Sequence, residues 1–290
     1  MKNVTSILLI IVCFASGYGQ STIRPNIYFQ DMNYYNIAAI PLIDSQQARF
    51  SFYSKYQFLE NDNEVWSKPP LFLLDIFGNL KNQHSYYNIG IATDQYSFYS
   101  RNTGYAGYTH RFHLGKSGNH TIDIGGRFIF NLDLINWDKL QLPSKETGKS
   151  LKPNADIDWG AYYRSRNFSL GISTKNMFST SVKSDDENLL MNQREFYVHT
   201  SYRFQIKDRF EIEPYLLYRK ELGSELDIGL HLGLYDWLDI AYQFRLLQLK
   251  HIFILQGYIT PSYSIGISFD QSPLVTDKNI DLLFRYNFRK

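Results

Sequence analysis

Histidines are the first residues whose type and spacing bear on chemistry. His110, His113 and His120 lie close together in the sequence, and imidazole nitrogens are common zinc ligands. A separation of three residues places His110 and His113 on opposite faces of an extended strand. No close pair of carboxylates completes a ligand set in this stretch. We therefore predict that these histidines lie at the surface or the rim of the fold and form no metal site.

Serine nucleophiles are the second candidate. Ser201 and Ser268 lie on the polar faces of extended segments, which leaves a lipase-like Ser–His pair as an alternative. Neither serine has the sharp nucleophile turn of a hydrolase, and the chain has no phosphate-binding glycine loop or dinucleotide fingerprint. The acidic run at residues 185–187 lacks the spacing of a calcium-binding loop. We predict no catalytic, cofactor-binding or metal-binding residue, and hence a protein that is not an enzyme.

Many of the other ionisable residues occupy alternate positions of extended segments, opposite the apolar side chains. These residues are Asp123, Arg127, Asp156, Asp158, Lys175, His199, Arg203, Glu211, Glu213, Arg219, Glu225, Asp227, His231, Asp239, Arg245 and Arg285. Both signs of charge are present in similar numbers. We interpret this set as a solvated, salt-bridged interior that fixes shape, because charges kept away from lipid need partners or water. The same face would line an open channel in a porin, and charge composition does not separate the two.

The C-terminal segment 279–290 shows the element that positions such a face. Its apolar side chains are Ile280, Leu282, Phe284, Tyr286 and Phe288, and its polar side chains alternate with them. Only a strand separates these two sets. A strand that ends in aromatic residues is typical of the closing strand of an outer-membrane β-barrel. The alternative for this strand alone is the edge of a soluble β-sandwich.

The same alternation recurs from residue 49 to residue 288, in about fourteen segments separated by turn residues. Every second connection is short, near residues 78–83, 115–118, 164–167, 207–209, 235–236 and 259–261. The connections at residues 59–68, 133–154, 176–194 and 271–278 are predicted to be longer. Membrane barrels alternate short periplasmic turns with longer outer loops, and their aromatic girdles agree with an aromatic content of 17%. We predict an all-β fold: a single transmembrane antiparallel barrel whose terminal strand pairs with residues 49–58 and 263–270.

The N-terminus has the features of a secretory signal. Lys2 precedes an apolar run at residues 7–15, and the small residues of Gly17-Tyr18-Gly19 precede a mature start at Gln20. We predict a signal peptide at 1–19, a lead-in or plug-like segment at 20–48 and the barrel at 49–290. The single cysteine, Cys13, would be lost with the signal. No later apolar run reaches the roughly 20 residues of a spanning helix, and a net charge of +2 suggests no nucleic-acid partner.

Several segments, taken in order, resemble the PorP/SprF family of outer-membrane proteins associated with type IX secretion and gliding motility in Bacteroidota. The resemblance runs from about Tyr28 to the C-terminus. Its segments are Tyr35–Pro41, where the family motif is degraded, Pro153–Tyr163 with Asn167–Asn176, Glu213–Pro214, Asp236–Arg245, Tyr263–Asp270 and Arg285–Phe288. The resemblance implies a fourteen-stranded barrel in the outer membrane that catalyses nothing and carries no established ligand residues.

The resemblance also implies partners and a role. We expect contact with outer-membrane lipid, with periplasmic components of the secretion machine and with a secreted adhesin as cargo, in a protein that helps secrete large adhesins or anchor them at the cell surface. The longest predicted outer connections, 133–154 and 176–194, are the candidate cargo surface, because binding residues concentrate on loops held by rigid scaffolds. The alternative is a transport barrel, either a porin or a fatty-acid channel.

Overall fold

The computed structural model describes residues 25–27, 32–40, 46–61, 64–80, 84–95, 99–115, 119–139, 148–184, 187–207, 210–220, 223–235, 237–273 and 278–289. The elements are η1 Met32–Tyr34, β1 Gln46–Asn61, β2 Glu64–Asn79, β3 Ser85–Gln95, β4 Tyr99–Leu114, β5 His120–Asn136, η2 Trp137–Lys139, β6 Lys149–Arg164, β7 Phe168–Lys175, β8 Ser181–Ser184, β9 Glu187–Met191, β10 Glu195–Tyr202, β11 Phe204–Lys207, β12 Phe210–Lys220, β13 Ser224–Leu234, β14 Leu238–Arg245, β15 Lys250–Tyr258, β16 Tyr263–Gln271 and β17 Lys278–Arg289. Neither short 3-10 helix is long and apolar enough to cross a membrane, and no other helix occurs among these residues.

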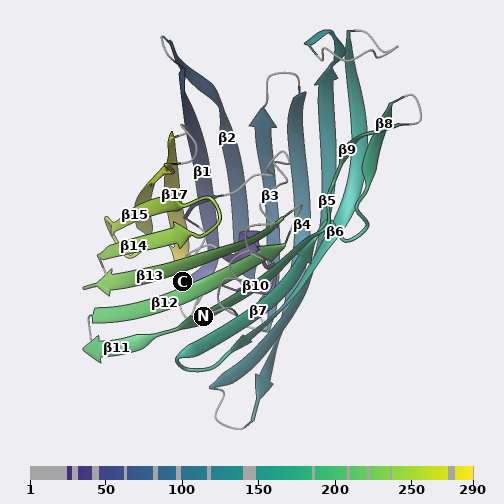
Figure 1. Cartoon of the computed structure of the whole chain (residues 1–290). Coiled ribbons are helices and arrows are strands. Elements are labelled where there is room, and N and C mark those ends of the chain that lie inside the picture. The colour runs from purple at the N-terminus through teal and green to yellow at the C-terminus, as the bar shows by residue number, and fades with distance from the viewer. Residues whose placement is uncertain are drawn as a thin grey trace, which may run out of the picture.

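Fifteen of the described strands form one antiparallel sheet that closes on itself (Figure 1), and β8 and β9 form a separate two-stranded sheet. From β1 to β7 and from β11 to β17 each strand pairs with its neighbour in the chain, and β1 pairs with β17. β10 and β11 are separated only by Arg203 and pair with the same partner, β12, while β10 also pairs with β7. Counted as one strand of the wall, β10 and β11 give a closed barrel of fourteen strands. The predicted fold class is confirmed.

β17 closes the barrel as the sequence predicted. Phe284 of this strand is paired with Phe52 of β1 on one side and with Ile265 of β16 on the other. The aromatic end is clustered, since the ring centroids of Tyr286 and Phe288 lie 4.6 Å apart. The predicted pairing of the terminal strand with residues 49–58 and 263–270 is therefore confirmed.

Inner and outer faces differ sharply because side chains alternate along each strand. In β5, Ile124 and Phe128 are 50% and 54% exposed, whereas Asp123 and Arg127 are 0% and 3% exposed. The exposed residues form the apolar outer face that a barrel presents to lipid, and the buried charges face the interior. The interior is therefore where a functional arrangement of polar side chains lies.

The two halves of the barrel wall differ in length. β1, β2, β4, β5 and β6 have 16 or 17 residues, whereas β7, β10, β14, β15 and β16 have 8 or 9. A tilted strand needs only about 9–11 residues to cross a membrane. The longer strands therefore continue beyond the membrane on the side of the β5–β6 connection.

These extensions correct two of the predicted loops. The prediction of a long connection at 59–68 is wrong, because β1 runs to Asn61 and β2 starts at Glu64. The connection at 133–154 is shorter than predicted, because β5 ends at Asn136 and β6 starts at Lys149. Strand residues beyond the lipid need no apolar outer face, so the alternation that marks a membrane strand fades there. The connection at 176–194 contains the small β8–β9 hairpin.

Candidate functional site in the barrel lumen

The described residues between 25 and 40 lie inside the barrel, and we call residues 25–27 and 32–40 the lumen segment. η1 of this segment is the short purple helix near the centre of Figure 1. Ile27, Tyr35, Ile37 and Ile40 are each at most 2% exposed. The predicted signal peptide lies outside the described residues, and the predicted chain divisions at residues 19 and 48 stay predictions.

One end of the lumen segment is bonded to β16 and β17. The backbone N–H of Asn26 donates to Asp281 Oδ2 at 2.8 Å, and its side-chain Nδ2 donates to Asp270 Oδ2 at 2.6 Å. Asp270 also accepts from Asn279 at 2.7 Å and forms an ion pair with Lys250 at 3.1 Å. Hydrogen bonds to ionised carboxylates are stronger than neutral ones, so this end of the segment is held firmly.

Asn36 attaches the segment to β6 and β7. Its Nδ2 donates to the carbonyl oxygens of Ala161 and Ile172, both at 3.1 Å, and its Oδ1 accepts from the backbone N–H of Ala38 at 3.0 Å. The wall makes room for this amide with two glycines. A Cβ atom would lie 2.0 Å from Asn36 Oδ1 at Gly160 and 2.8 Å from Asn36 Nδ2 at Gly171.

Four backbone carbonyls of the segment accept hydrogen bonds from wall side chains. The donors are Arg127 to Tyr34 O at 3.1 Å, Ser173 to Tyr35 O at 2.8 Å, Thr109 to Ile37 O at 2.9 Å and Arg164 to Ile40 O at 2.6 Å. They come from four different strands, β5, β7, β4 and β6. A non-helical backbone buried in this way needs partners for its polar groups, and these contacts supply them.

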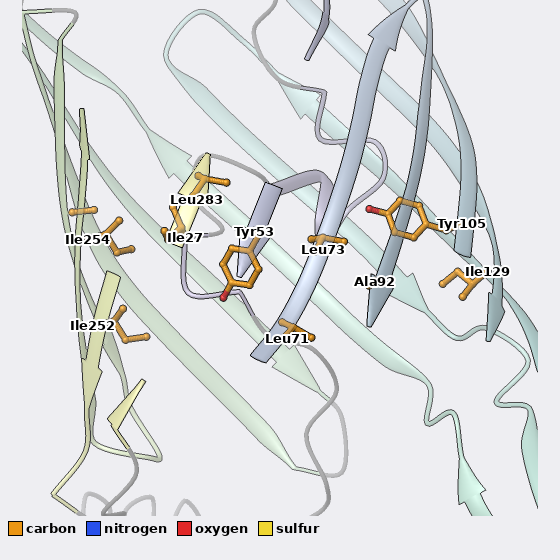
Figure 2. Packing of buried hydrophobic residues seen from close by; sticks show 11 residues of the cluster. Ile27, Tyr53, Leu71, Leu73, Ala92, Tyr105, Ile129, Ile252, Ile254 and Leu283 are labelled. Atoms are coloured by element: carbon orange, nitrogen blue, oxygen red, sulfur yellow. The ribbon is translucent and has the colours of Figure 1, made fainter. Parts of the chain in front are cut away.

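Apolar contacts fix the segment as well. Ile27 belongs to a buried cluster that includes Tyr53, Leu73 and Leu283 of the wall (Figure 2). Tyr35 belongs to a second cluster, where its ring centroid lies 5.2 Å from that of Tyr197. An inward-facing apolar surface of this size is unusual in a water-filled pore, where the interior is polar. Here it is covered by the lumen segment.

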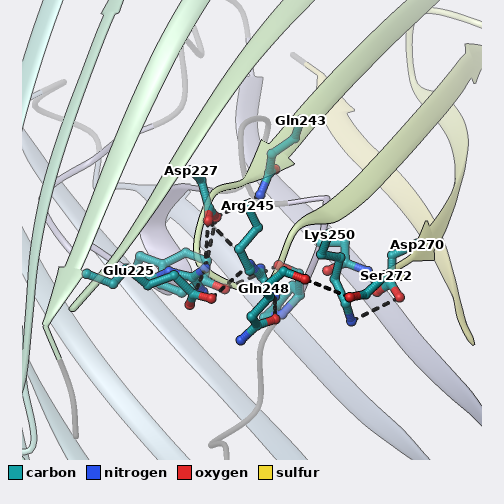
Figure 3. Close-up of polar contacts among 12 residues, drawn as sticks. Glu225, Asp227, Gln243, Arg245, Gln248, Lys250, Asp270 and Ser272 are labelled. Carbon is teal, nitrogen blue, oxygen red and sulfur yellow. Dashed lines mark hydrogen bonds and ion pairs between the residues drawn. The ribbon is translucent and has the colours of Figure 1, made fainter. Parts of the chain in front are cut away.

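A dense charge network lies on the inner face of β12, β13 and β14 (Figure 3). Asp227 accepts from Arg219 at 2.9 Å, from Gln243 at 2.7 Å and from Arg245 at 3.3 Å. Glu225 adds ion pairs to Arg219 at 2.8 Å and to Arg245 at 3.6 Å. Two acids therefore neutralise two buried arginines, which is how ion pairs are tolerated away from water.

The predicted interior residues do face inward. Twelve of the sixteen are buried, and four are partly exposed. Of these four, Arg203 forms ion pairs with Glu211 and Glu213, and Asp239 lies 3.2 Å from His231. The predicted set left out other charges that are buried on the same face: Arg49, Asp75, Asp133, Glu195, Lys250, Asp270 and Asp281. All seven also occupy alternate strand positions, so the signal that identified the first set was present for them too.

Glu211, Glu213 and His231 form a cluster that sequence reasoning did not single out. One ligand atom from each lies within 4.8 Å of the others. Arg203 already pairs with both acids, at 3.2 Å from Glu213 and 3.6 Å from Glu211, and Asp239 lies 3.2 Å from His231. Three carboxylates therefore share one arginine and one histidine, which already serve as their partners. The absence of a metal site stays a prediction.

The other candidate residues lie in several places. His110 and His113 both lie beside His84, with ring centroids 6.5 and 5.1 Å from that of His84, while the exposed His120 contacts the Tyr163 hydroxyl at 2.8 Å. Ser201 on β10 bonds to the Ser169 hydroxyl at 2.7 Å, and Ser268 lies on β16. The structure therefore does not bring these predicted candidates together into one site.

Comparison with known proteins adds the family and the fold. Residues 20–281 match the family described as type IX secretion system membrane protein PorP/SprF. No curated protein matches the chain. Similar solved structures include the CymD monoaromatic hydrocarbon channel (TM-score 0.57, 8% identity, 96% of this chain and 97% of that one) and Omp33 of Acinetobacter baumannii (0.54, 11%, 84% and 99%). A Pseudomonas aeruginosa FadL homologue is similar too (0.54, 10%, 90% and 94%). At these identities the likeness shows the fold alone.

Proposed function

Because the chain belongs to the PorP/SprF family of type IX secretion system membrane proteins and has the fold of an outer-membrane β-barrel, we propose that it is a non-enzymatic accessory barrel that helps secrete large adhesins or anchor them at the cell surface. The proposed mechanism is recognition without bond chemistry. The outer extensions meet the cargo, and the periplasmic turns meet components of the secretion machine. Residues 1–19 are proposed to be a signal peptide, which mass spectrometry of the mature N-terminus would test.

The attachment of the lumen segment to the inner wall is the observation that carries this proposal. The lumen segment is hydrogen-bonded to β4, β5, β6, β7, β16 and β17 and covers the apolar inner surface. A barrel that passes solutes needs a continuous open path, whereas a barrel that acts as a platform does not. The tightly held lumen segment supports the second kind of role.

The cargo surface is proposed at the outer ends of the long strands. Trp137 donates through Nε1 to Ser150 Oγ at 2.6 Å, and Asp138 accepts from the backbone N–H of Gly148 at 2.8 Å, so the base of the β5–β6 connection is ordered. Asp156 accepts backbone hydrogen bonds from Phe178 and Thr180 at the start of the β7–β10 connection. These contacts hold both connections on a rigid scaffold, which suits binding.

Deletion of the two connections tests the proposal. Residues 140–147 and 181–191 are replaced by short Gly-Ser linkers in the native host, which leaves the strands that flank them in place. Surface display of the dependent adhesin is then measured with an antibody on intact cells. We expect display to fall while heat-modifiable barrel stays at wild-type levels. The matched control alters the tight turn at residues 246–249, and normal display in the double deletion would disprove the proposed cargo surface.

A transport barrel is the second candidate, because the fold is shared with a hydrocarbon channel. Single-channel recording of the purified protein in a planar bilayer separates the two. A steady open conductance supports transport, and a silent membrane supports the platform. For the enzymatic alternative, we expect no labelling of Ser201 or Ser268 by a serine-reactive fluorophosphonate.

A further inference from the structure

Histidine side chains on the outer face of the barrel are paired with tyrosine hydroxyl groups. Among the described residues, three strand histidines point outward by the alternation of their strands. The Nδ1 atom of each lies within hydrogen-bond distance of a tyrosine hydroxyl: His110 of Tyr108 at 3.2 Å, His120 of Tyr163 at 2.8 Å and His251 of Tyr242 at 2.7 Å. The pairing is therefore a repeated feature of the surface that faces lipid.

All three pairs lie near strand ends, where a membrane barrel meets the lipid head groups. His120 is the first residue of β5, and His110 is paired across the sheet with Ser85, the first residue of β3. His251 is the second residue of β15, at the opposite end of the barrel. β15 has only 9 residues, about the length needed to cross a membrane, so its ends lie close to the two interfaces. Tyrosine is one of the aromatic residues that membrane barrels place at these levels.

Neighbouring rings hold the imidazoles in place. The centroid of each imidazole lies close to that of another aromatic ring: Phe112 at 4.6 Å for His110, Tyr163 at 6.1 Å for His120 and Phe244 at 5.0 Å for His251. The two nitrogens of an imidazole have different roles when one of them is hydrogen-bonded. Because the tyrosine hydroxyl lies against Nδ1 in every pair, Nε2 is the nitrogen on the far side of the ring, available to an outside partner.

The hydrogens of each pair define what that partner must be. A neutral imidazole carries one N–H and a tyrosine carries one O–H. Their mutual hydrogen bond uses one of these two hydrogens in either tautomer, so one donor remains. At His110 the Ser85 hydroxyl, 2.9 Å from that of Tyr108, adds one hydrogen and one bond, and a donor again remains. The outside partner therefore accepts a hydrogen bond. Lipid phosphates offer ionised acceptor oxygens at this level, and hydrogen bonds to ionised groups are roughly twice as strong as neutral ones.

We propose that the three His–Tyr pairs are binding sites for the phosphate groups of membrane lipids. Each pair donates its remaining hydrogen to a phosphate oxygen, and the acyl chains lie along the apolar wall, where Ile124 and Phe253 are 50% and 54% exposed. The sites at His110 and His120 bind lipids of the periplasmic leaflet, and the site at His251 binds a lipid of the outer leaflet. Contacts to both leaflets fix the depth of the barrel in the membrane. The proposal is independent of the cargo surface and of the lumen segment.

Lipid binding by the purified full-length protein in detergent micelles tests the proposal. Native mass spectrometry counts the lipids that the protein retains as dipalmitoyl phosphatidylglycerol is added. Dipalmitoylglycerol, which has the same acyl chains and no phosphate, is the comparison. We expect saturable binding of about three phosphatidylglycerol molecules per barrel, each roughly three- to tenfold tighter than dipalmitoylglycerol, in keeping with one hydrogen bond per site. Equal binding of the two lipids, or no retained phosphatidylglycerol, would overturn the proposal.

Variants locate the sites. His120→Phe and His251→Phe should each remove one tightly bound phosphatidylglycerol and leave the binding of dipalmitoylglycerol unchanged. Tyr163→Phe keeps the ring, removes only the hydroxyl that positions His120, and should weaken binding at that site. His113→Phe is the matched control, because His113 is also exposed but its position in β4 alternates with the outward-facing residues. Heat-modifiable migration checks the folding of each variant, and if His251→Phe does not fold, His120→Phe decides. An unchanged lipid count in His120→Phe, or an equal loss in His113→Phe, would contradict the proposal.

Discussion

The side-chain amide of Asn36 occupies the space that a side chain at position 160 would need. A Cβ atom on Gly160 would lie 2.0 Å from Asn36 Oδ1, far inside any van der Waals contact. Gly160 is therefore part of the attachment of the lumen segment, although its only contribution is the room that it leaves. A single substitution in the wall can therefore change how the lumen segment is attached.

Gly160→Ala should loosen the lumen segment without altering its sequence. The added methyl group displaces the Asn36 amide from the Ala161 and Ile172 carbonyls. The test uses Ile37→Cys in a background without Cys13, with Gly160 either unchanged or replaced by Ala. The cysteine should react with a maleimide at least tenfold faster in the Gly160→Ala protein, because the free energy needed to expose the segment falls by about 1.4 kcal/mol or more. Gly126→Ala is the control, because its Cβ would meet only Asp158 O at 3.8 Å. Equal labelling rates in all three proteins would contradict this account.

Asn36→Ala should lower the free energy of unfolding by about 1–3 kcal/mol, since it removes the amide that satisfies two wall carbonyls and Ala38 N–H. Urea titration in detergent micelles measures the change. The double variant with Gly160→Ala gives the sharper result. Once Asn36 is absent, the methyl group at 160 meets less obstruction, so the two losses should not add. Additive losses would place the effect of Gly160 elsewhere.

Arg127→Met should destabilise the barrel by about 3–5 kcal/mol, because it leaves the Asp158 carboxylate buried without its ionic partner. The two groups are 2.6 Å apart, and both side chains are at most 3% exposed. Adding Asp158→Asn should recover part of the loss, since the remaining pair of side chains is neutral. The free energies of unfolding of the two single variants and the double variant give the coupling. A double variant as unstable as the sum of the singles would show that the pair is not coupled.

Gly90→Ala should destabilise the barrel by about 1–3 kcal/mol through overpacking. The ring of Tyr105 lies over Gly90 and reaches Asp75 two strands away, and a Cβ at Gly90 would lie 2.3 Å from that ring. Gly104→Ala is the matched control in the neighbouring strand, since nothing lies within 4 Å of its Cβ position. Thermal unfolding followed by heat-modifiable migration compares the two, and equal shifts would contradict the role of the ring.

Phe288→Asp should impair assembly into the outer membrane. Phe288 is 45% exposed on the lipid face of the closing strand, where a charge is unfavourable. The amount of heat-modifiable barrel in outer-membrane fractions measures assembly. Asn287→Asp is the control, because it adds the same charge on the inner face opposite Arg49. Wild-type levels of folded barrel in Phe288→Asp would contradict the placement of this strand.

The alternation of side chains was enough to predict the wall. Strands such as β5 and β13 keep apolar residues at every second position because one face meets lipid, and their partners followed from chain order. The outer half of β6 was not predicted, because a strand beyond the lipid needs no strong apolar pattern. Leu151, Pro153 and Ala155 share one face there, but this pattern was too weak to indicate a strand.

The sequence pattern did not predict how the segment inside the barrel is attached to the wall. Residues 32–40 show no period because their backbone is irregular and their polar groups bond to four strands, β4, β5, β6 and β7, that are distant in the chain. The role of Gly160 and Gly171 could not be seen either, since a glycine in a strand looks the same whether it makes a bend or makes room. Only the three-dimensional contact with Asn36 distinguishes the two.

The attachment points of the lumen segment also have a mechanical meaning. Asn26 is bonded to β16 and β17 and Asn36 to β6 and β7, and β7 stands seven strands from β17 in either direction around the ring of fourteen. The segment therefore braces the cylinder across its diameter. A sideways load on the tall outer strands tends to flatten an empty cylinder into an oval. Here that deformation must first stretch the hydrogen bonds of Asn26 and of Asn36. The barrel therefore keeps a round cross-section when a force acts on its outer strands.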